Sequence, residues 1–406
     1  MYSVFEPSRW PNLNIPDLDG ACGYTAFTPA ELDRRHAAVR RALDEVGADA
    51  LLVQNDFPPA TTGCNPKCAW LSGTTKYRNT VSLLLRREEG PLGVFHGGKT
   101  SSCPGCTDPY LLRDGPKLLE ALSGVGRLAY GNGLGLITYS FYQTLMERCP
   151  GLELVEFSNE LEHLISIKSP EEIEAVRNTC AIQDRIFQAA STFLYPGRTG
   201  IEILADLTRL LMLLGSDPTL TPKVILTLGK NRPLSDGWRE WVLNDRNYRI
   251  ERDDYISLVL ETPGCGGYYA ERERRYFFQR PHPDHQAAHD AALALHRFQM
   301  SRLRPNVSLA QFRAEVNEYK AAAGLPPSAP GVPFGTELRG MGLLTVDRPQ
   351  IECAWEDMPL LEGHVVTSMS TVRPPVHAPC MIFEMAVIAQ EGAYTPSELP
   401  LDLIVL

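Results

Sequence analysis

The stretch from Tyr255 to Gln279, YISLVLETPGCGGYYAERERRYFFQ, constrains the fold more than any other part of the chain. It begins with a mostly apolar run, Tyr255 to Leu260, which is long enough for one buried strand. The sequence PGCGG follows and favours a tight turn, because glycine adopts positive φ angles with little strain. The chain then returns through an alternating charged segment into a short aromatic run. This stretch therefore predicts a β-hairpin whose second strand is charged.

The second strand of this hairpin carries charges on both of its faces. Because side chains alternate along a strand, Tyr269, Glu271, Glu273 and Arg275 are expected on one face and Arg274 on the other. Two carboxylates on one face of a buried hairpin are unfavourable unless they bind a cation, a metal or a substrate. Burial of such a pair raises one of the two pKa values, which supplies an acid and a base near neutrality. A solvated edge strand with cross-strand ion pairs is the alternative interpretation.

Composition excludes several classes of protein. The length of 406 residues suggests two or three domains, and the net charge of −10 argues against a nucleic acid or an anionic membrane as partner. The first residues lack a basic region followed by an apolar run, so no secretory signal is predicted. No apolar stretch reaches the 18 residues of a membrane span. The ten cysteines are scattered along the chain, and we therefore expect a cytoplasmic protein.

Four of these cysteines are candidate ligands of a structural metal site. Cys64 and Cys68 form a CxxxC pattern, and Cys103 and Cys106 form a CxxC pattern. Two such pairs resemble a zinc clip. A redox pair at Cys103 and Cys106, or unreactive surface loops, are the alternatives, and the spacing does not decide among them.

Hydrophobic periodicity predicts an α/β pattern in the first part of the chain and long helices in the second. A helix is expected after Thr28, with strands over residues 50–53, 81–85 and 93–96. The phrase ISIKSPEEIE marks a boundary, because its serine, proline and second glutamate have the spacing of a helix cap. Further long helices are predicted from Thr199 and over residues 283–303.

The phrases IKSPEEIE, PGRTGIEI, GYYAERER and LLEGHVVTSMS together resemble the creatinase, prolidase and aminopeptidase P family, over essentially the whole chain. The resemblance implies an α+β fold, with a creatinase-type N-terminal α/β domain over residues 1–160 and a pita-bread catalytic domain over residues 161–406. It also implies a homodimer in which Tyr77 and Arg78 complete the pocket of the neighbouring subunit. Within the family, GYYAERER is most similar to creatinase.

Peptidases of this family hold two metal ions with two Asp, one His and two Glu, and the resemblance indicates that most of these ligands are missing. Glu271 corresponds to the second Asp and Glu384 to the last Glu, while Glu261 lies near the position of the first Asp. The segment that carries the metal His corresponds to GTELRGMGLLTVDRP, which has no histidine. Ser370 replaces the other Glu. Because at most three oxygen ligands are left, neither a metal ion nor a cofactor is predicted.

Creatinase works without metal, and the resemblance to it implies a set of substrate contacts. Glu273 corresponds to a guanidinium-binding Glu, and Tyr269 to the Tyr four residues before it. Arg348 corresponds to a later substrate-binding Arg, with Asp347 beside it. The catalytic His of creatinase has no counterpart, since REWVLNDRN lacks histidine. His377 is the histidine nearest the expected pocket and is our candidate replacement.

These residues define a predicted site and a function. The catalytic candidates are Glu271, Glu273, Glu384, Tyr269 and His377, and the substrate-binding candidates are Tyr77, Arg78, Arg348, Asp347, Ser370 and Arg274. We expect a metal-independent, creatinase-like enzyme that hydrolyses a C–N bond in a small polar amine, amide or guanidino substrate by carboxylate acid/base catalysis. The alternatives are a lyase, cyclase or isomerase of specialised metabolism on the same fold, a non-catalytic binding protein, and a metallo-aminopeptidase or prolidase.

Overall fold

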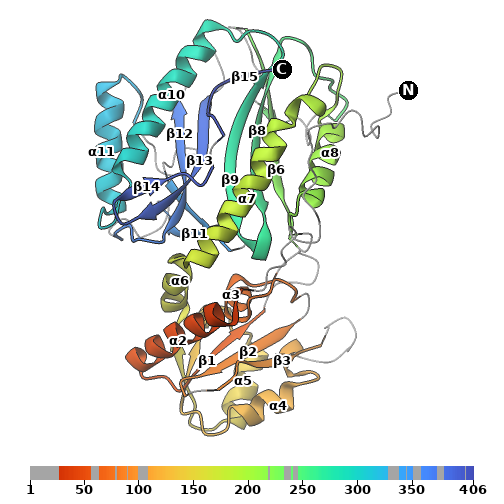
Figure 1. Ribbon diagram of the computed structural model, residues 1–406. Coiled ribbons are helices and arrows are strands. Elements are labelled where there is room, and N and C mark those ends of the chain that lie inside the picture. The colour runs from red at the N-terminus through yellow and green to blue at the C-terminus, as the bar shows by residue number, and fades with distance from the viewer. Residues whose placement is uncertain are drawn as a thin grey trace. The chain divides into compact units, whose positions relative to one another are not determined.

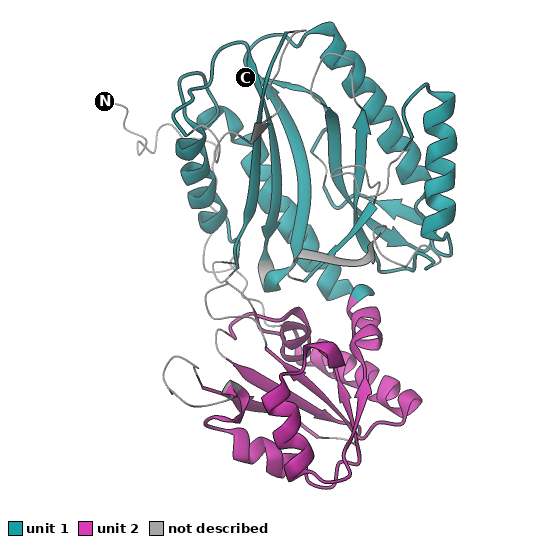
Figure 2. Cartoon of the chain, turned by 180° about the vertical axis from the view of Figure 1, so that it is seen from behind, with its two compact units in different colours: residues 1–25, 166–406 teal, residues 26–165 magenta. Residues whose placement is uncertain are grey.

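The computed structural model divides into two compact units (Figures 1 and 2), whose described parts lie within residues 26–165 and 166–406. The structure describes residues 27–55, 64–77, 80–88, 90–98, 108–217, 220–232, 246–327, 338–343, 358–372, 379–397 and 399–406, with the backbone alone at 109, 239–240, 265 and 345–350.

The first unit is a five-stranded sheet in the order β3-β2-β1-β4-β5, with helices packed around it (Figure 1). Its central strand, β1, is buried along its whole length and pairs antiparallel with β2 and parallel with β4. The strands are β1 Ala50–Gln54, β2 Val81–Arg86, β3 Gly93–His96, β4 Arg127–Tyr130 and β5 Glu153–Glu156. The helices are α2 Pro29–Val46, α3 Pro66–Ser72, α4 Gly115–Ala121, α5 Tyr139–Arg148 and α6 Ser158–Ser166, with 3-10 turns at Pro109–Leu111 and Leu134–Leu136.

The predicted first helix forms because its ends are well capped. The Thr28 hydroxyl accepts a hydrogen bond from the Glu31 amide at 3.2 Å, and Gly47 ends the helix with a φ of 66°. The predicted strands at 50–53, 81–85 and 93–96 are present as well. The α/β character expected for this part of the chain is confirmed.

The second unit contains two five-stranded sheets, and the hairpin predicted at Tyr255–Gln279 is the centre of the first. This sheet has the order β15-β9-β8-β6-β7. Its long strands β8 and β9 are buried at every residue whose side chain is described, and Gly266 and Gly267 take positive φ angles in the turn. The strands are β6 Lys223–Lys230, β7 Arg239–Glu240, β8 Asp254–Pro263, β9 Tyr269–Phe277 and β15 Ile404–Val405.

Two helices, α7 Pro170–Gln188 and α8 Gly200–Leu213, cover the outer face of this sheet (Figure 1). Both begin with a capping box: Ser169 with Glu172 in α7, and Thr199 with Glu202 in α8. Their apolar faces pack against the even-numbered residues of β8, 256, 258 and 260. The odd-numbered residues of β8 therefore face the other way, as do their partners in β9.

The second sheet has the order β11-β10-β12-β13-β14, and its strand β13 lies beside β9 of the first sheet. Helices α10 Pro283–Arg302 and α11 Leu309–Ala322 cover it, with Leu295 and Phe312 in the shared core (Figure 1). The strands are β10 Leu338–Gly342, β11 Thr345–Gln350, β12 Val365–Val372, β13 Cys380–Ala389 and β14 Gly392–Tyr394, and 3-10 turns occur at Ala190–Thr192 and Cys265–Gly267. The arrangement confirms the predicted α+β class.

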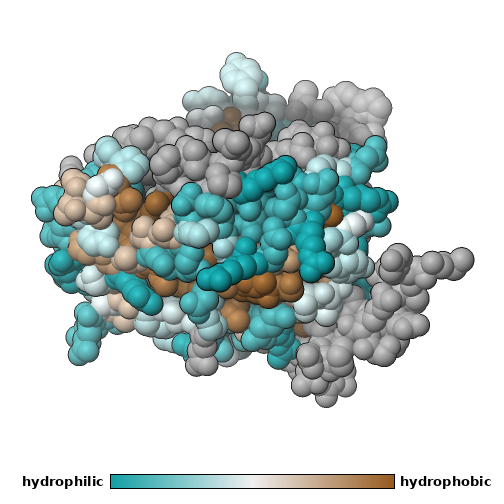
Figure 3. Space-filling model, turned by 90° about the horizontal axis from the view of Figure 1, so that it is seen from above, coloured by the Kyte–Doolittle hydropathy of each residue, from teal (hydrophilic) through white to brown (hydrophobic). Residues whose placement is uncertain are grey.

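Apolar residues also reach the surface of this unit. Figure 3 shows a band of hydrophobic residues between hydrophilic ones on one face of the molecule. Ile201, Met212 and Val405 are among the large apolar side chains that are exposed. More than half of an ordinary protein surface is apolar, so these residues do not by themselves indicate an interface.

None of the helices in the described ranges is long and apolar enough to cross a membrane.

Candidate functional site

Two buried carboxylates face each other across the β8–β9 hairpin. Glu261 and Glu271 are register partners, and the side chain of each is 3% exposed. Directly opposed residues of an antiparallel pair point to the same face, with Cβ atoms about 5 Å apart. The two like charges therefore lie close together, and this arrangement is unfavourable without nearby cations.

Two cationic side chains from neighbouring strands supply the opposite charge. Lys223, the register partner of Glu261 in β6, places its Nζ 2.8 Å from Glu261 Oε2. Arg339 of β10 forms an ion pair with Glu271, and its Nη2 also lies 3.7 Å from Glu261 Oε2. The Lys223 side chain is 56% exposed and that of Arg339 is 27% exposed, so the cations extend toward solvent while the carboxylates lie inside. We call these four residues the carboxylate cluster.

The carboxylate cluster favours proton exchange at Glu271. Burial raises the pKa of Glu271 above its ordinary value, the negative charge of Glu261 raises it further, and the Arg339 guanidinium opposes both effects. A carboxyl group whose pKa is moved toward neutrality is better suited to accept and return a proton than an ordinary one. Glu271 is therefore the strongest candidate for a general base in the described part of the chain.

Glu273 lies two residues further along the same face of β9 and has its own partners. The Ser257 hydroxyl donates a hydrogen bond to its Oε1 at 2.6 Å, and Arg275 Nε lies 3.8 Å from the same oxygen. Burial raises the pKa of Glu273, against the opposing charge of Arg275. Arg275 in turn lies over the Tyr255 ring, 5.3 Å from its centroid. Glu273 thus belongs to a separate polar group next to the carboxylate cluster.

An apolar group adjoins these carboxylates where β8 meets β12 and β13. It comprises Val259, Met369, Met381 and Phe383, with Ile225 packed against it. The thioether of Met385 accepts a hydrogen bond from the backbone amide of Glu271 at 3.3 Å. Thioether and aromatic side chains carry no formal charge. This apolar group therefore lowers the local polarity and strengthens the electrostatic interactions of the carboxylate cluster.

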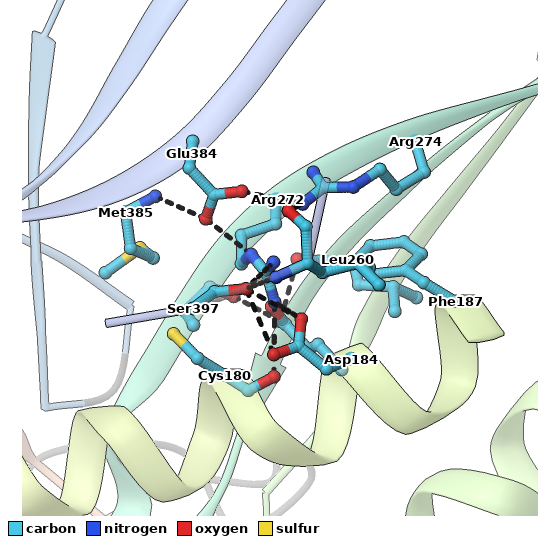
Figure 4. A network of polar contacts seen from close by, with 12 residues as sticks. Cys180, Asp184, Phe187, Leu260, Arg272, Arg274, Glu384, Met385 and Ser397 are labelled. Atoms are coloured by element: carbon cyan, nitrogen blue, oxygen red, sulfur yellow. Dashed lines mark hydrogen bonds and ion pairs between the residues drawn. The ribbon is translucent and has the colours of Figure 1, made fainter. Parts of the chain in front are cut away.

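Glu384 belongs to a different network on the opposite face of β9 (Figure 4). Its two oxygens accept hydrogen bonds from Arg272 Nε at 2.5 Å and Arg274 Nη2 at 2.8 Å. Arg272 also contacts Asp184 of α7, with 2.5 Å between Nη1 and Oδ1. The Phe187 ring lies below both guanidinium groups. We call this group the arginine network.

The arginine network fixes Glu384 as a structural anion. Burial alone would raise its pKa, but Arg272 and Arg274 outweigh this effect and hold the pKa of Glu384 below its ordinary value. The sequence analysis placed Glu384 with Glu271 and Glu273 in one site. The structure separates them, because residues 271 and 273 of β9 point to one face whereas 272 and 274 point to the other. Arg274, expected to bind substrate, forms an ion pair with Glu384 in this network.

The remaining described candidates have partners within the protein. The Tyr269 hydroxyl donates to the Thr221 carbonyl at 3.0 Å, and burial raises its pKa. The Ser370 hydroxyl donates to Gln299 of α10, so it lies on the helix-covered face of β12. Tyr77 is half-buried in the first unit, where burial raises the pKa of its hydroxyl. The hydrogen bonds named here do not involve the carboxylate cluster, but the negative charge of Glu261 also raises the pKa of Tyr269 and links this residue to the cluster.

Several predicted residues fall outside the described part of the chain. Arg78 and His377 lie there entirely, as do Cys103 and Cys106 of the proposed zinc clip. For Asp347 and Arg348 only the backbone is described, and Asp347 pairs with Gly340 across β10–β11. The roles expected for these residues stay predictions.

The described cysteines of the proposed clip are buried in the first unit. Cys64 and Cys68 are not joined by a disulfide, and burial raises the pKa of the Cys64 thiol to about 12. Within the ranges that the structure describes, no three His, Cys, Asp or Glu side chains gather as a metal site requires.

The donor set at the carboxylate cluster does not fit a pair of metal ions. Glu271 and Glu261 are already paired with Arg339 and Lys223, and Glu384 is bound by two guanidinium groups on the other face. A tight dinuclear site needs several anionic or neutral donors around each ion, and guanidinium and ammonium groups are donors of neither kind. No metal-dependent step is therefore derived for this chain.

Sequence reasoning missed the two cations of the cluster. Lys223 is an ordinary lysine at the start of a strand, and only the β6–β8 register places it opposite Glu261. Arg339 lies in the segment GTELRGMGLLTVDRP, which lacks the histidine of the family and carries this arginine. The sequence did contain one signal of this cluster. A basic residue, Arg339, occupies the segment in which a metal ligand is expected.

Comparison with known proteins shows which family the chain resembles. Residues 174–390 match the model of metallopeptidase family M24. The probable dipeptidase PepE of Mycobacterium tuberculosis strain H37Rv is 26% identical over 246 residues, which cover 61% of this chain and 62% of that protein. The Xaa-Pro dipeptidase of Pyrococcus furiosus is 23% identical over 260 residues, or 64% of this chain and 71% of that one. The chain therefore matches somewhat less than two thirds of the length of the PepE relatives.

Solved structures confirm the fold. The prolidase from Pyrococcus horikoshii OT3 superposes with a TM-score of 0.69 at 17% identity, covering 91% of this chain and 100% of that chain. An Xaa-Pro dipeptidase from Bacillus anthracis gives a TM-score of 0.71 at 18% identity, covering 92% and 100%. These likenesses extend over nearly the whole chain and establish the predicted pita-bread fold.

Proposed function

Since this chain belongs to metallopeptidase family M24, we propose that it is a hydrolase that cleaves a C–N bond in a small polar amide, peptide or guanidino substrate. The observation that carries the proposal is the buried pair of Glu261 and Glu271 with two cationic side chains beside it. Such a pair combines a proton acceptor with groups that stabilise developing negative charge.

The relatives support an amide C–N bond as the bond that is cleaved. Two of them are named as dipeptidases, and a dipeptidase hydrolyses an amide C–N bond. The guanidino alternative comes from the similarity of GYYAERER to creatinase, and this finer placement is part of the proposal. The relatives are distant in sequence. The substrate of this chain therefore has to be identified by screening compounds, and it is not inferred from the substrates of the relatives.

Hydrolysis at this cluster uses Glu271 as the base. Glu271 accepts a proton from water while the water oxygen bonds to the substrate carbon, and the former C=O or C=N π electrons move to the heteroatom. Arg339 and Lys223 stabilise the resulting negative charge. When the C–N bond breaks, the electron pair on the heteroatom re-forms the double bond, the C–N electron pair stays with nitrogen, and Glu271 returns the proton to that nitrogen. The net change is that one water is consumed and the substrate is divided into an amine and a carboxylic acid, or into an amine and urea when the substrate is a guanidino compound.

We propose that this reaction proceeds without the pair of metal ions of the family. The support is chemical: the carboxylates on one face already bind Lys223 and Arg339, and Glu384 binds Arg272 and Arg274 on the other. Positive charge near the substrate would then come from side chains. The expected homodimer and the expected location in the cytoplasm stay predictions.

A release assay tests the function. Purified protein is incubated with a panel of dipeptides, including Xaa-Pro dipeptides, and with small amides and guanidino acids such as creatine, and the released amine is quantified with and without a chelator. We expect at least one substrate to be hydrolysed at a rate that the chelator leaves unchanged and that Glu271→Gln abolishes. The matched control is Glu318→Gln, an exposed carboxylate of α11, which should keep the wild-type rate. Hydrolysis of none of these compounds, or loss of activity on chelation, would overturn the proposal.

One observation favours a second candidate, a non-catalytic binding protein. Both carboxylates of the cluster are neutralised by internal cations, an arrangement that needs no turnover to be stable. Calorimetric titration with the same compounds separates the two functions. Binding without hydrolysis, abolished by Glu271→Gln, would favour the binding protein.

A further inference from the structure

We propose that Arg339 is the resident cation of the Glu261–Glu271 pair and that its guanidinium keeps divalent metal ions out of this site. The inference rests on the proposed location of the site but on no measurement of turnover. It assigns to Arg339 one part of the poor fit between this site and a metal ion, beside the missing histidine and Ser370.

Arg339 contacts both carboxylates of the pair. Its Nη2 forms an ion pair with Glu271 and lies 3.7 Å from Glu261, so a single guanidinium reaches both carboxylates. Both acidic side chains are 3% exposed. Buried carboxylates this close together need a positive charge between them, and Arg339 supplies it from a strand of the other sheet.

The net charge of the carboxylate cluster disfavours the binding of a further cation. Glu261 and Glu271 contribute two negative charges, and Lys223 and Arg339 contribute two positive ones, so the four side chains are neutral together. A divalent ion entering beside them would leave the group with an excess of two positive charges. An arginine does not lose its proton in proteins, so the guanidinium has to move away before a metal ion binds.

The position of Lys223 explains why Arg339 is the decisive residue. The lysine side chain is 56% exposed and contacts Glu261, whereas the arginine is 27% exposed and reaches both carboxylates. A flexible, exposed ammonium group is able to swing into solvent when a metal ion arrives. The more buried, bridging guanidinium is the group that fills the space between the carboxylates.

Substitution of Arg339 is expected to convert the cluster into a metal site. Arg339→His leaves two carboxylates and adds one neutral imidazole, which together form a donor set that first-row divalent metals bind. Arg339→Gln removes the positive charge without adding a strong ligand. If the guanidinium excludes metal ions, both variants gain affinity, and the histidine variant gains more.

The test measures binding of Mn²⁺ alone, by isothermal titration calorimetry and by the shift in melting temperature. We expect the wild type and the control Arg304→His, at an exposed arginine, to bind weakly and alike. Arg339→His should bind one ion per chain at least about tenfold more tightly, equivalent to about 1.4 kcal/mol. Arg339→His/Glu271→Gln should lose this gain.

Two results would overturn the inference. One is tight Mn²⁺ binding by the wild type that Glu271→Gln removes, because Arg339 would then not exclude the metal. The other is an affinity of folded Arg339→His and Arg339→Gln no greater than that of Arg304→His. If Arg339→His alone fails to fold, Arg339→Gln still decides the matter. Failure of the hydrolysis assay leaves these binding results unaffected, so the two proposals are tested separately.

Discussion

Glu261 and Glu271 are opposed residues of one antiparallel strand pair, both almost fully buried, and a single arginine side chain reaches them both. Two carboxylates and a guanidinium in this relation form a compact electrostatic unit whose components depend on one another. Loss of the arginine makes Glu271 harder to ionise, and loss of either acid leaves the arginine with less compensation.

The pH dependence of hydrolysis should report the pKa of Glu271. Its raised pKa means that the base is lost as the pH falls through a value above the ordinary 4.5 of a glutamate. Because the Arg339 charge lowers this pKa, Arg339→Gln should move the acidic limb of the kcat/KM profile to higher pH. The profile is measured on the best substrate of the release assay. An acidic limb that stays in place in Arg339→Gln would show that another group is titrating.

Glu384 should contribute to stability and not to catalysis. Glu384→Gln keeps the shape of the side chain but leaves Arg274 without its carboxylate and Arg272 with Asp184 alone in a buried site. Removing one partner of a buried ion pair costs about 3–5 kcal/mol. Urea unfolding measures this loss, and the control is Glu391→Gln, an exposed residue beyond β13, which should change stability by about 0.5 kcal/mol or less. A change at Glu384 no larger than at Glu391 would contradict the role of the network.

The same carboxylate should make stability depend on acid. The folded-state pKa of Glu384 lies below 4.5, so the unfolded chain takes up this proton first as the pH falls. Its stabilising effect is therefore complete above an unfolded pKa of about 4.5 and is lost as the pH falls through the lower folded value. The stability difference between wild type and Glu384→Gln should narrow below pH 4.5, as measured by urea unfolding at a series of pH values. A constant difference across that range would be inconsistent with an ionised Glu384.

The hairpin was predictable because its signals are local. An apolar run, a glycine-rich turn and a charged return strand follow one another within 25 residues, and the period of two assigns Glu271 and Glu273 to one face. The long helices were predictable for a similar reason, since Ser169 and Thr199 begin capping boxes that are visible as short spacings. The resemblance of four phrases to a known family then supplied the overall fold.

The composition of the site was not predictable, because it depends on register between distant strands. Lys223 and Glu261 meet through the β6–β8 pairing, and Arg339 comes from the second sheet. Glu384 was grouped with Glu271 because both occupy positions that resemble metal ligands. Its actual partner, Arg272, lies 112 residues away in sequence, and the face on which they meet is set by the packing of β13 beside β9. Sequence spacing holds no information on that packing.

Gly363 provides a test of how the second sheet joins the start of α7. Its φ of 88° is unfavourable for other residues, and a Cβ atom there would lie 2.9 Å from the Lys168 carbonyl oxygen. That backbone cannot withdraw freely, because the Lys168 amide donates a hydrogen bond to the Gly363 carbonyl at 2.9 Å. Gly363→Ala should therefore combine left-handed strain of about 1–2 kcal/mol with a steric cost of about 1–3 kcal/mol. The matched control is Gly324→Ala, at a φ of 68° with nothing within 4 Å of the added atom, which should show the strain alone. Equal losses in urea unfolding for the two variants would mean that the contact between Gly363 and Lys168 is looser than the structure indicates.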